Sequence, residues 1–153
     1  MATIKMHTAT FNGFTFTRGS KTRTYAFVVI EGGSLAADRI RYEREAREDW
    51  RRNFDYQNDK AHGIFTLAEK YPDQYPQERR DQEQAEAQAR IARGEEGLVA
   101  PVLERFDQNR RNYQTTPDGD TYYVAMGWTS RRDLADKLAQ GRPHAIILPA
   151  TVA

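Results

Sequence analysis

The sequence predicts an α+β fold: one mainly antiparallel sheet of about five or six strands, built from both chain ends, with a central charged helical insertion. Three observations predict it. Residues 3–30 hold short runs of alternating apolar and polar side chains separated by turn signals. Residues 34–113 are dominated by Arg, Glu, Gln and Ala, which favour helices. Residues 114–153 return to strand-like runs. A chain of 153 residues fits a single domain.

Residues 1–33 predict a three-stranded antiparallel β-meander. Ile4 and Met6 point to one face of the first strand, and Lys5 and His7 to the other, wet face. Asn12-Gly13 favours a type I′ hairpin turn, because both residues tolerate positive φ. The third strand, residues 22–30, is apolar on both faces, so we expect a central strand covered above and below.

The first half of the insertion predicts a long, mostly exposed helix. Ser34 is a natural N-cap, and residues 36–55 carry several oppositely charged pairs at i,i+4 spacing. The apolar stripe of this helix is narrow, so the helix is expected to lie on a surface rather than inside a core. Its members are Leu35, Tyr42, Ala46, Trp50 and Phe54. Trp50 is interpreted as a packing residue, as is Trp128 where helix and sheet meet.

The second half of the insertion predicts a helix with little to bury. Pro76 suits its first turn and Gly94 its C-terminal cap. Between them, residues 77–93 contain no aromatic residue, and Ile91 is the only large aliphatic one. The helix therefore either projects into solvent or contacts a partner through small residues and charges. A better anchored helix is expected over residues 98–113.

The last forty residues predict a hairpin, a helix and a final strand. The hairpin spans residues 113–126 around the Pro117-Asp118-Gly119-Asp120 turn. Ser130 and Asp133 fit a capping box that opens a helix ending near Gln140. Residues 144–148 form the last strand.

No catalytic constellation is visible, so we expect a protein that is not an enzyme and carries no cofactor or metal. There is no cysteine, and the three histidines fall in three different predicted elements. Asp118 and Asp120 could ligate a hard cation, but Pro-Asp-Gly-Asp is more often ordinary turn chemistry. No phosphate-binding glycine loop or nucleophile elbow is present.

A basic cluster raises the alternative of single-stranded nucleic-acid binding. Arg18, Lys21 and Arg23 lie near the tip of the second predicted hairpin. Aromatic residues on its arms supply base-stacking groups in such proteins; here these are Phe14, Phe16, Tyr25 and Phe27. The opposing interpretation is that the aromatic residues face the core and the basic ones solubilise a turn. The whole chain carries a net charge of only +1, whereas general polyanion binders show a dominant basic excess.

The mismatch between much helix and few large apolar residues favours a protein-binding module. Ordering a residue costs roughly 1–2 kcal/mol of backbone entropy. Helices that bury few apolar side chains must offset this cost in another way, and binding to a partner is one. The candidate contact residues are Arg79, Arg80, Arg90 and Arg93. Two alternatives stay open: a helical hairpin packed flat with a wet outer face, and a homodimer through the seam of Ala85, Ala89 and Ala92.

The sequence indicates a soluble, cytoplasmic protein without a membrane partner. No run of residues reaches the length of about 20 apolar residues that a membrane span needs. No basic and then apolar leader opens the chain.

Two stretches carry a resemblance to known proteins. They are residues 16–18 with 25–29 (FTR and YAFVV), and residues 127–128 with 132–135 (GW and RDLA). Both are similar to segments of small accessory proteins of bacteriophages and plasmids. The resemblance implies a protein that docks on a host protein or protein complex, such as a defence nuclease complex, and inhibits it. It assigns no functional residue.

Overall fold

The computed structural model describes residues 3–153 and contains two compact units. The strand unit comprises the chain up to Asp38 and from Asn112 onward, and the helical unit comprises Arg39–Arg111. The bounds of the helical unit lie close to those predicted for the insertion, although a single domain was expected. Within the described residues, none of the helices has the length and apolar character needed to span a membrane.

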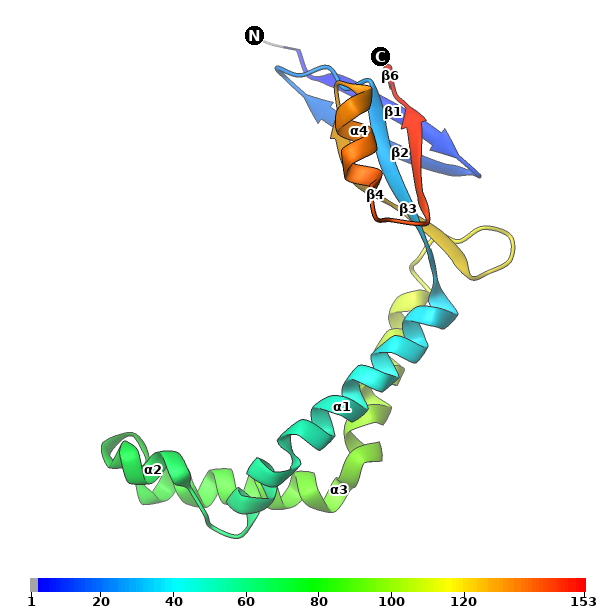
Figure 1. The fold of residues 1–153 in the computed structure, drawn as a ribbon. Coiled ribbons are helices and arrows are strands. Elements are labelled where there is room, and N and C mark those ends of the chain that lie inside the picture. Colours follow the sequence, from blue (N-terminus) through cyan, green and yellow to red (C-terminus); the bar gives the residue numbers. More distant parts are fainter. Residues whose placement is uncertain (1–2) are drawn as a thin grey trace. The chain divides into compact units, whose positions relative to one another are not determined.

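The strand unit contains six strands in two antiparallel sheets of three (Figure 1). The first sheet has the order β2-β1-β6 and the second the order β4-β3-β5. Both chain ends supply strands, and the two long helices come between them in the sequence, so the predicted α+β class is confirmed. The six strands form two sheets rather than one. Their bounds are β1 Lys5–Phe11, β2 Phe14–Ser20, β3 Phe27–Ser34, β4 Thr121–Thr129, β5 Ala145–Pro149 and β6 Thr151–Val152.

The predicted meander is wrong at its third strand. β1 and β2 form the expected hairpin with Phe11 opposite Phe14, and Asn12 has the positive φ of 47° that this turn requires. β3, however, pairs with β4 and β5 and not with β2. The physical reason lies in the pattern of β3: a strand that is apolar on both faces needs a neighbour on each side and cover on each face. β2 has one wet face and fits an edge.

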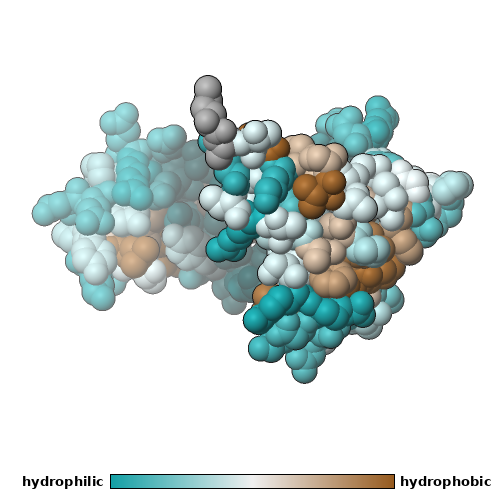
Figure 2. Space-filling view, turned by 90° about the horizontal axis from the view of Figure 1, so that it is seen from above, coloured by the Kyte–Doolittle hydropathy of each residue, from teal (hydrophilic) through white to brown (hydrophobic). Residues whose placement is uncertain are grey.

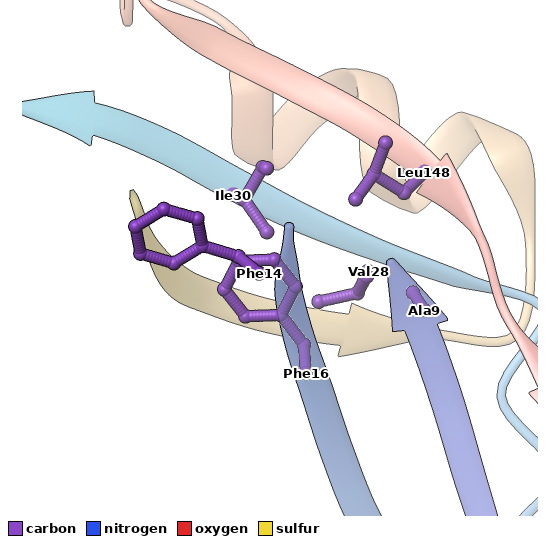
Figure 3. Packing of buried hydrophobic residues seen from close by; sticks show 6 residues of the cluster. All are labelled: Ala9, Phe14, Phe16, Val28, Ile30 and Leu148. Atoms are coloured by element: carbon purple, nitrogen blue, oxygen red, sulfur yellow. The ribbon is translucent and has the colours of Figure 1, made fainter. Parts of the chain in front are cut away.

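The core of the strand unit lies between its two sheets (Figure 3). One sheet contributes Ala9, Phe14 and Phe16, and the other contributes Val28, Ile30 and Leu148. Val29 is also fully buried, on the opposite face of β3, where helix α4 (Arg132–Ala139) contacts this sheet and buries Ala135. The prediction of a central strand is confirmed for residues 27–30, but residues 22–26 form no strand and β3 continues to Ser34.

His7, predicted on a wet face, is instead completely buried. Its Nε2 accepts a hydrogen bond from the backbone N–H of Tyr25 at 3.0 Å. Since a backbone N–H can only donate, the ring proton must sit on Nδ1, which donates to the Arg18 carbonyl at 3.1 Å. The imidazole is thus a neutral, fully hydrogen-bonded core residue. The alternating pattern of β1 does not predict this burial, because it cannot show that two backbone groups satisfy a polar side chain inside the core.

Two local predictions at the C-terminal end are also corrected. Residues 113–116 form no strand, so the predicted hairpin over 113–126 reduces to a closed loop that precedes β4. Helix α4 is confirmed, but Ser130 does not cap it. Its N-cap position is Arg131, with no side-chain hydrogen bond, because the helix begins later than the capping box requires. Trp128 packs against the core between the sheets rather than at a junction with a helix.

The helical unit contains most of α1 (Leu35–Ala61, of which residues 35–38 belong to the strand unit), α2 (Thr66–Lys70), a 3-10 turn η1 (Pro72–Gln74) and α3 (Gln77–Arg110). α3 bends sharply (Figure 1) at Gly94, whose φ of 71° and ψ of −175° are not helical. The predicted break at Gly94 is confirmed, although the second segment resumes directly after it rather than at Leu98. Ser34 caps α1 as predicted: its Oγ accepts a hydrogen bond from the backbone N–H of Ala37 at 3.2 Å.

Candidate functional site

The candidate site is an open groove between α1 and α3, with a volume of about 730 Å³. Its lining comes from both helices of one unit and includes three aromatic and three arginine side chains. We call it the interhelical groove. It is lined by Tyr42, Glu45, Ala46, Asp49, Trp50, Asn53, Phe54 and Gln57 of α1, and by Arg90, Arg93, Gly94, Gly97, Leu98, Pro101, Val102 and Arg105 of α3.

The groove is open because the two helices have only small residues to bury between them. The buried apolar residues described in the helical unit are Ala46, Ala68, Ala87 and Val99, and none is large. The larger members of the α1 stripe face an incompletely covered space: Tyr42 is 42% exposed and Phe54 38%. Leu98 of α3, across the groove, is 41% exposed. The apolar stripe of α1, which would be buried if α3 covered it completely, is therefore about half exposed to solvent.

Polar and charged contacts hold the two helices together. Arg39 forms a two-pronged pair with Asp107, with Nε–Oδ1 and Nη2–Oδ2 distances of 2.9 and 3.1 Å. Arg47 bridges Glu43 on its own helix and Glu96 on α3. These hydrogen bonds raise the pKa of both arginines and lower the pKa of the Glu96 and Asp107 carboxyl groups. The helix pair thus depends less on apolar burial than an ordinary helical hairpin does.

The far end of α1 is attached to the first segment of α3 in the same way. The side-chain amides of Gln84 and Gln88 both donate to the carbonyl of Ala61, at 3.3 and 3.1 Å. The Nζ atom of Lys60 lies 3.4 Å from Oε1 of Glu83, which makes an ion pair between the two helices. Of the residues in the first segment of α3, only Ala87 is buried. The prediction that residues 77–93 have little to bury agrees with this packing.

The bend in α3 shapes one wall of the groove. The helix breaks at Gly94, and three residues later Gly97 has no room for a side chain, because a Cβ there would lie 2.6 Å from the Cβ of Arg93. Pro101, one turn further on, has no backbone N–H, so it cannot donate to the carbonyl of Gly97 as an α-helix requires. Arg93, Gly94, Gly97 and Pro101 all line the groove, so the bend forms part of its wall.

Three arginines line the groove without an ion pair. Arg90, Arg93 and Arg105 are exposed, and no carboxylate among residues 3–153 lies within ion-pair distance of them. The two carboxylates of the groove are already paired on their own helix, Glu45 with Arg41 and Asp49 with Arg52. The groove therefore presents unneutralised positive charge beside exposed aromatic rings.

The four arginines predicted as contact residues separate into two pairs. Arg90 and Arg93 lie at the groove. Arg79 and Arg80, in the first turn of α3, hold the turn that precedes this helix. Arg79 donates to the Gln74 carbonyl at 2.6 Å and its guanidinium lies 4.2 Å from the Tyr75 ring centroid. Arg80 donates to the Tyr75 carbonyl at 2.9 Å. The side chains of Arg79 and Arg80 therefore bind groups of the protein itself. The third arginine that lines the groove is Arg105.

The basic cluster of the strand unit lacks the aromatic surface that base stacking requires. Arg18, Lys21 and Arg23 are exposed, whereas Phe14, Phe16 and Tyr25 are buried, and the half-buried Phe27 lies under the guanidinium of Arg132. Arg18 lies over the Tyr25 ring, 5.0 Å from its centroid, and covers it further. Exposed hydrophobic residues of this unit include Ile4 and Met6. Figure 2 shows hydrophobic residues gathered in one area of the surface and bordered by hydrophilic ones.

Asp118 and Asp120 have separate structural roles rather than a shared ligand. Asp118 accepts four hydrogen bonds that close its loop, from the hydroxyls of Thr116 and Thr121 and the backbone N–H groups of Asp120 and Thr121. These bonds hold the pKa of the Asp118 carboxyl well below its usual range. Asp120 accepts from the N–H of Ala36 in the first turn of α1. Among residues 3–153 no His, Asp or Glu cluster suits a metal ion.

Sequence reasoning missed three residues of the groove. The sequence pattern predicts Trp50 as a packing residue and Tyr42 as part of a covered stripe, and it gives no signal for Arg105. An apolar stripe predicts a buried face, but it does not reveal that the facing helix bends and supplies too few large side chains to cover it. In the sequence, this bend is indicated by two glycines close together, Gly94 and Gly97, followed by Pro101.

Comparisons with protein-family models, with curated proteins and with solved structures found no match to this chain.

Proposed function

We propose that this protein acts without catalysis, by binding a partner protein through the interhelical groove. The observation that carries the proposal is the combination of half-exposed aromatic rings and three unpaired arginines in one groove. Exposed aromatic and arginine side chains are the residue types that contribute most to protein–protein binding. Without a partner, the aromatic rings of the groove stay in contact with water, and their apolar surface contributes little to the stability of the protein.

The groove favours a protein over a nucleic acid. The free arginines lie on the α3 wall only, whereas the α1 wall opposite them carries Glu45 and Asp49, so the groove offers separate positive positions rather than the continuous basic track that a phosphate backbone follows. Apolar groups such as Leu98, Val102 and Phe54 have no counterpart in a sugar–phosphate chain, but they match apolar side chains. A protein segment can satisfy both the arginines and the apolar groups.

The resemblance to accessory proteins of phages and plasmids suggests the biological setting. Such proteins act stoichiometrically on a factor of their host, so we infer an inhibitor that occupies a host protein or protein complex. A groove that binds by charge and a few apolar anchors suits this role, because electrostatic complementarity accelerates association. The interaction would take place in the cytoplasm.

Affinity purification from the native host tests the proposal with three proteins. They are the wild type, the groove variant R90E/R93E/R105E, and the control R18E/K21E/R23E, which reverses the same number of charges on the strand unit. We expect one stoichiometric partner with the wild type and the control, and none with the groove variant. Since the three groove arginines make no ion pair among the described residues, the groove variant should keep its melting temperature. Equal recovery of the partner by the groove variant would refute the groove as the binding site.

A further inference from the structure

We propose that the interhelical groove receives an acidic amphipathic α-helix of the partner, with apolar side chains on one face and carboxylates beside them. This inference rests on the proposed function and names the chemistry of its ligand. It follows from three properties of the groove: the position of its charges, its length, and the type of its apolar groups.

The arginines of the groove lie at two separated positions, and each position suits a carboxylate of the ligand. α1 and α3 run antiparallel, as the ring contact of Tyr42 with Phe106 and the pair of Lys60 with Glu83 show. Arg105 therefore lies toward the Tyr42 end, while Arg90 lies toward the Gln57 end. Arginine is preorganised for two-pronged contact with a carboxylate, so each position selects Asp or Glu.

The length of the groove suits a short helix. Its α1 wall runs from Tyr42 to Gln57, which is about 22 Å at 1.5 Å per residue. A ligand helix of about four turns spans that length. Arg93 and Arg105 are twelve residues apart along a bent helix, which corresponds to about 18 Å between their Cα atoms, less than the length of such a ligand helix. The same ligand helix can therefore reach both positions.

The apolar groups of the groove provide anchoring surface for side chains at helical spacing. Trp50 and Phe54 are one turn apart on α1, with ring centroids 5.8 Å from each other. Ala46 precedes them by one turn and is buried, which leaves a depression beside the rings. Helices bound in such grooves insert apolar residues at i, i+3 or i+4, and i+7. Carboxylates flanking that stripe would meet the arginines of α3.

A random peptide library tests the inference even while the partner is unidentified. A displayed library of 16-residue peptides is selected on the full-length wild-type protein and depleted on R90E/R93E/R105E. We expect enriched sequences that are rich in Asp and Glu and carry apolar residues at helical spacing. A synthetic peptide from that pool should bind the wild type in titration calorimetry and bind the groove variant about 30-fold more weakly, because three attractions become three repulsions. Its affinity should fall with added salt.

Several results would overturn the inference. They are a failure to enrich any sequence, enrichment of basic or uncharged peptides, or equal binding of the acidic peptide to the wild type and the groove variant. Binding of a 20-nucleotide single-stranded DNA that depends on the three arginines would assign the groove to nucleic acid. Light scattering that shows a dimer for the wild type and a monomer for the groove variant would assign it to a second copy. If the affinity purification succeeds while the library fails, the groove binds a protein of different chemistry, and only this inference is lost.

Discussion

The hydroxyl of Ser34 donates a 2.6 Å hydrogen bond to Oδ2 of Asp120, a residue 86 positions later in the chain. The other oxygen of the same carboxylate accepts from the N–H of Ala36 at 2.8 Å, so both residues serve the first turn of α1. A helix N-terminus leaves its first N–H groups without intrahelical partners, and a carboxylate there also complements the helix dipole. The start of the long helix is therefore defined by two distant segments.

Removal of the Asp120 carboxylate should lower stability. We expect Asp120→Ala to reduce the free energy of unfolding by about 1–2 kcal/mol, the usual cost of a lost N-cap. Asp120→Asn keeps an acceptor oxygen for Ala36 and should recover part of the loss. Urea denaturation followed by circular dichroism at 222 nm measures both. Equal stability of all three proteins would show that the interaction adds nothing to the cap of Ser34.

The buried His7 should tolerate no apolar replacement. His7→Phe leaves the Tyr25 N–H and the Arg18 carbonyl without their partner, at a cost of about 1–3 kcal/mol for each buried group left unsatisfied. The matched control is His144→Phe, because His144 is exposed and a surface substitution changes stability by about 0.5 kcal/mol or less. Urea midpoints that fall equally in both variants would contradict the role assigned to His7.

Asp118 should make the stability of the protein depend on acid pH. Its pKa is lowered in the folded state by four hydrogen bonds to the ionised carboxylate. The stabilisation is therefore present above the unfolded-state pKa, near 4, and is lost as the pH falls below it. Thermal midpoints measured from pH 7 to pH 2.5 should decline less for Asp118→Asn than for the wild type. Parallel declines would assign the acid sensitivity to other carboxylates.

The bend at Gly94 should be intolerant of any side chain. Its φ of 71° with ψ of −175° is a conformation that essentially only glycine adopts, so Gly94→Ala should cost about 1–3 kcal/mol. The cost comes from the local backbone conformation and not from packing, because no atom of a more distant residue lies within 4 Å of the position that a Cβ would take. The test is the urea midpoint, with Ala92→Gly, an exposed site on the same helix, as the reference. A Gly94→Ala protein as stable as the wild type would mean that α3 can straighten at no cost.

The sequence predicted local structure well where one residue pattern decides it. The hairpin turn at Asn12-Gly13, the cap at Ser34 and the break at Gly94 each follow from backbone geometry that few residue types support. The two-sided apolar pattern also predicted a central strand, which the structure places at residues 27–34 rather than 22–30.

The sequence did not predict the relations between distant segments. Strand patterns show that β3 needs two neighbours, but not that β4 and β5, much later in the chain, supply them. The sequence around Asp120 predicts only a turn. It does not show that the Asp120 carboxylate binds the N-terminus of α1, because that segment lies far earlier in the chain. The groove was missed for the same reason: the exposure of Trp50 and Phe54 depends on how little the facing helix covers.

Hydrogen exchange of the partner complex tests the central claim most directly. The isolated protein and its purified complex are compared by mass spectrometry of peptides that cover the chain. We predict slower exchange on binding over residues 42–57 and 90–105, the two walls of the groove, with residues 14–27 unchanged. Protection confined to residues 14–27, or absent from both walls of the groove, would contradict the claim that this groove binds the partner.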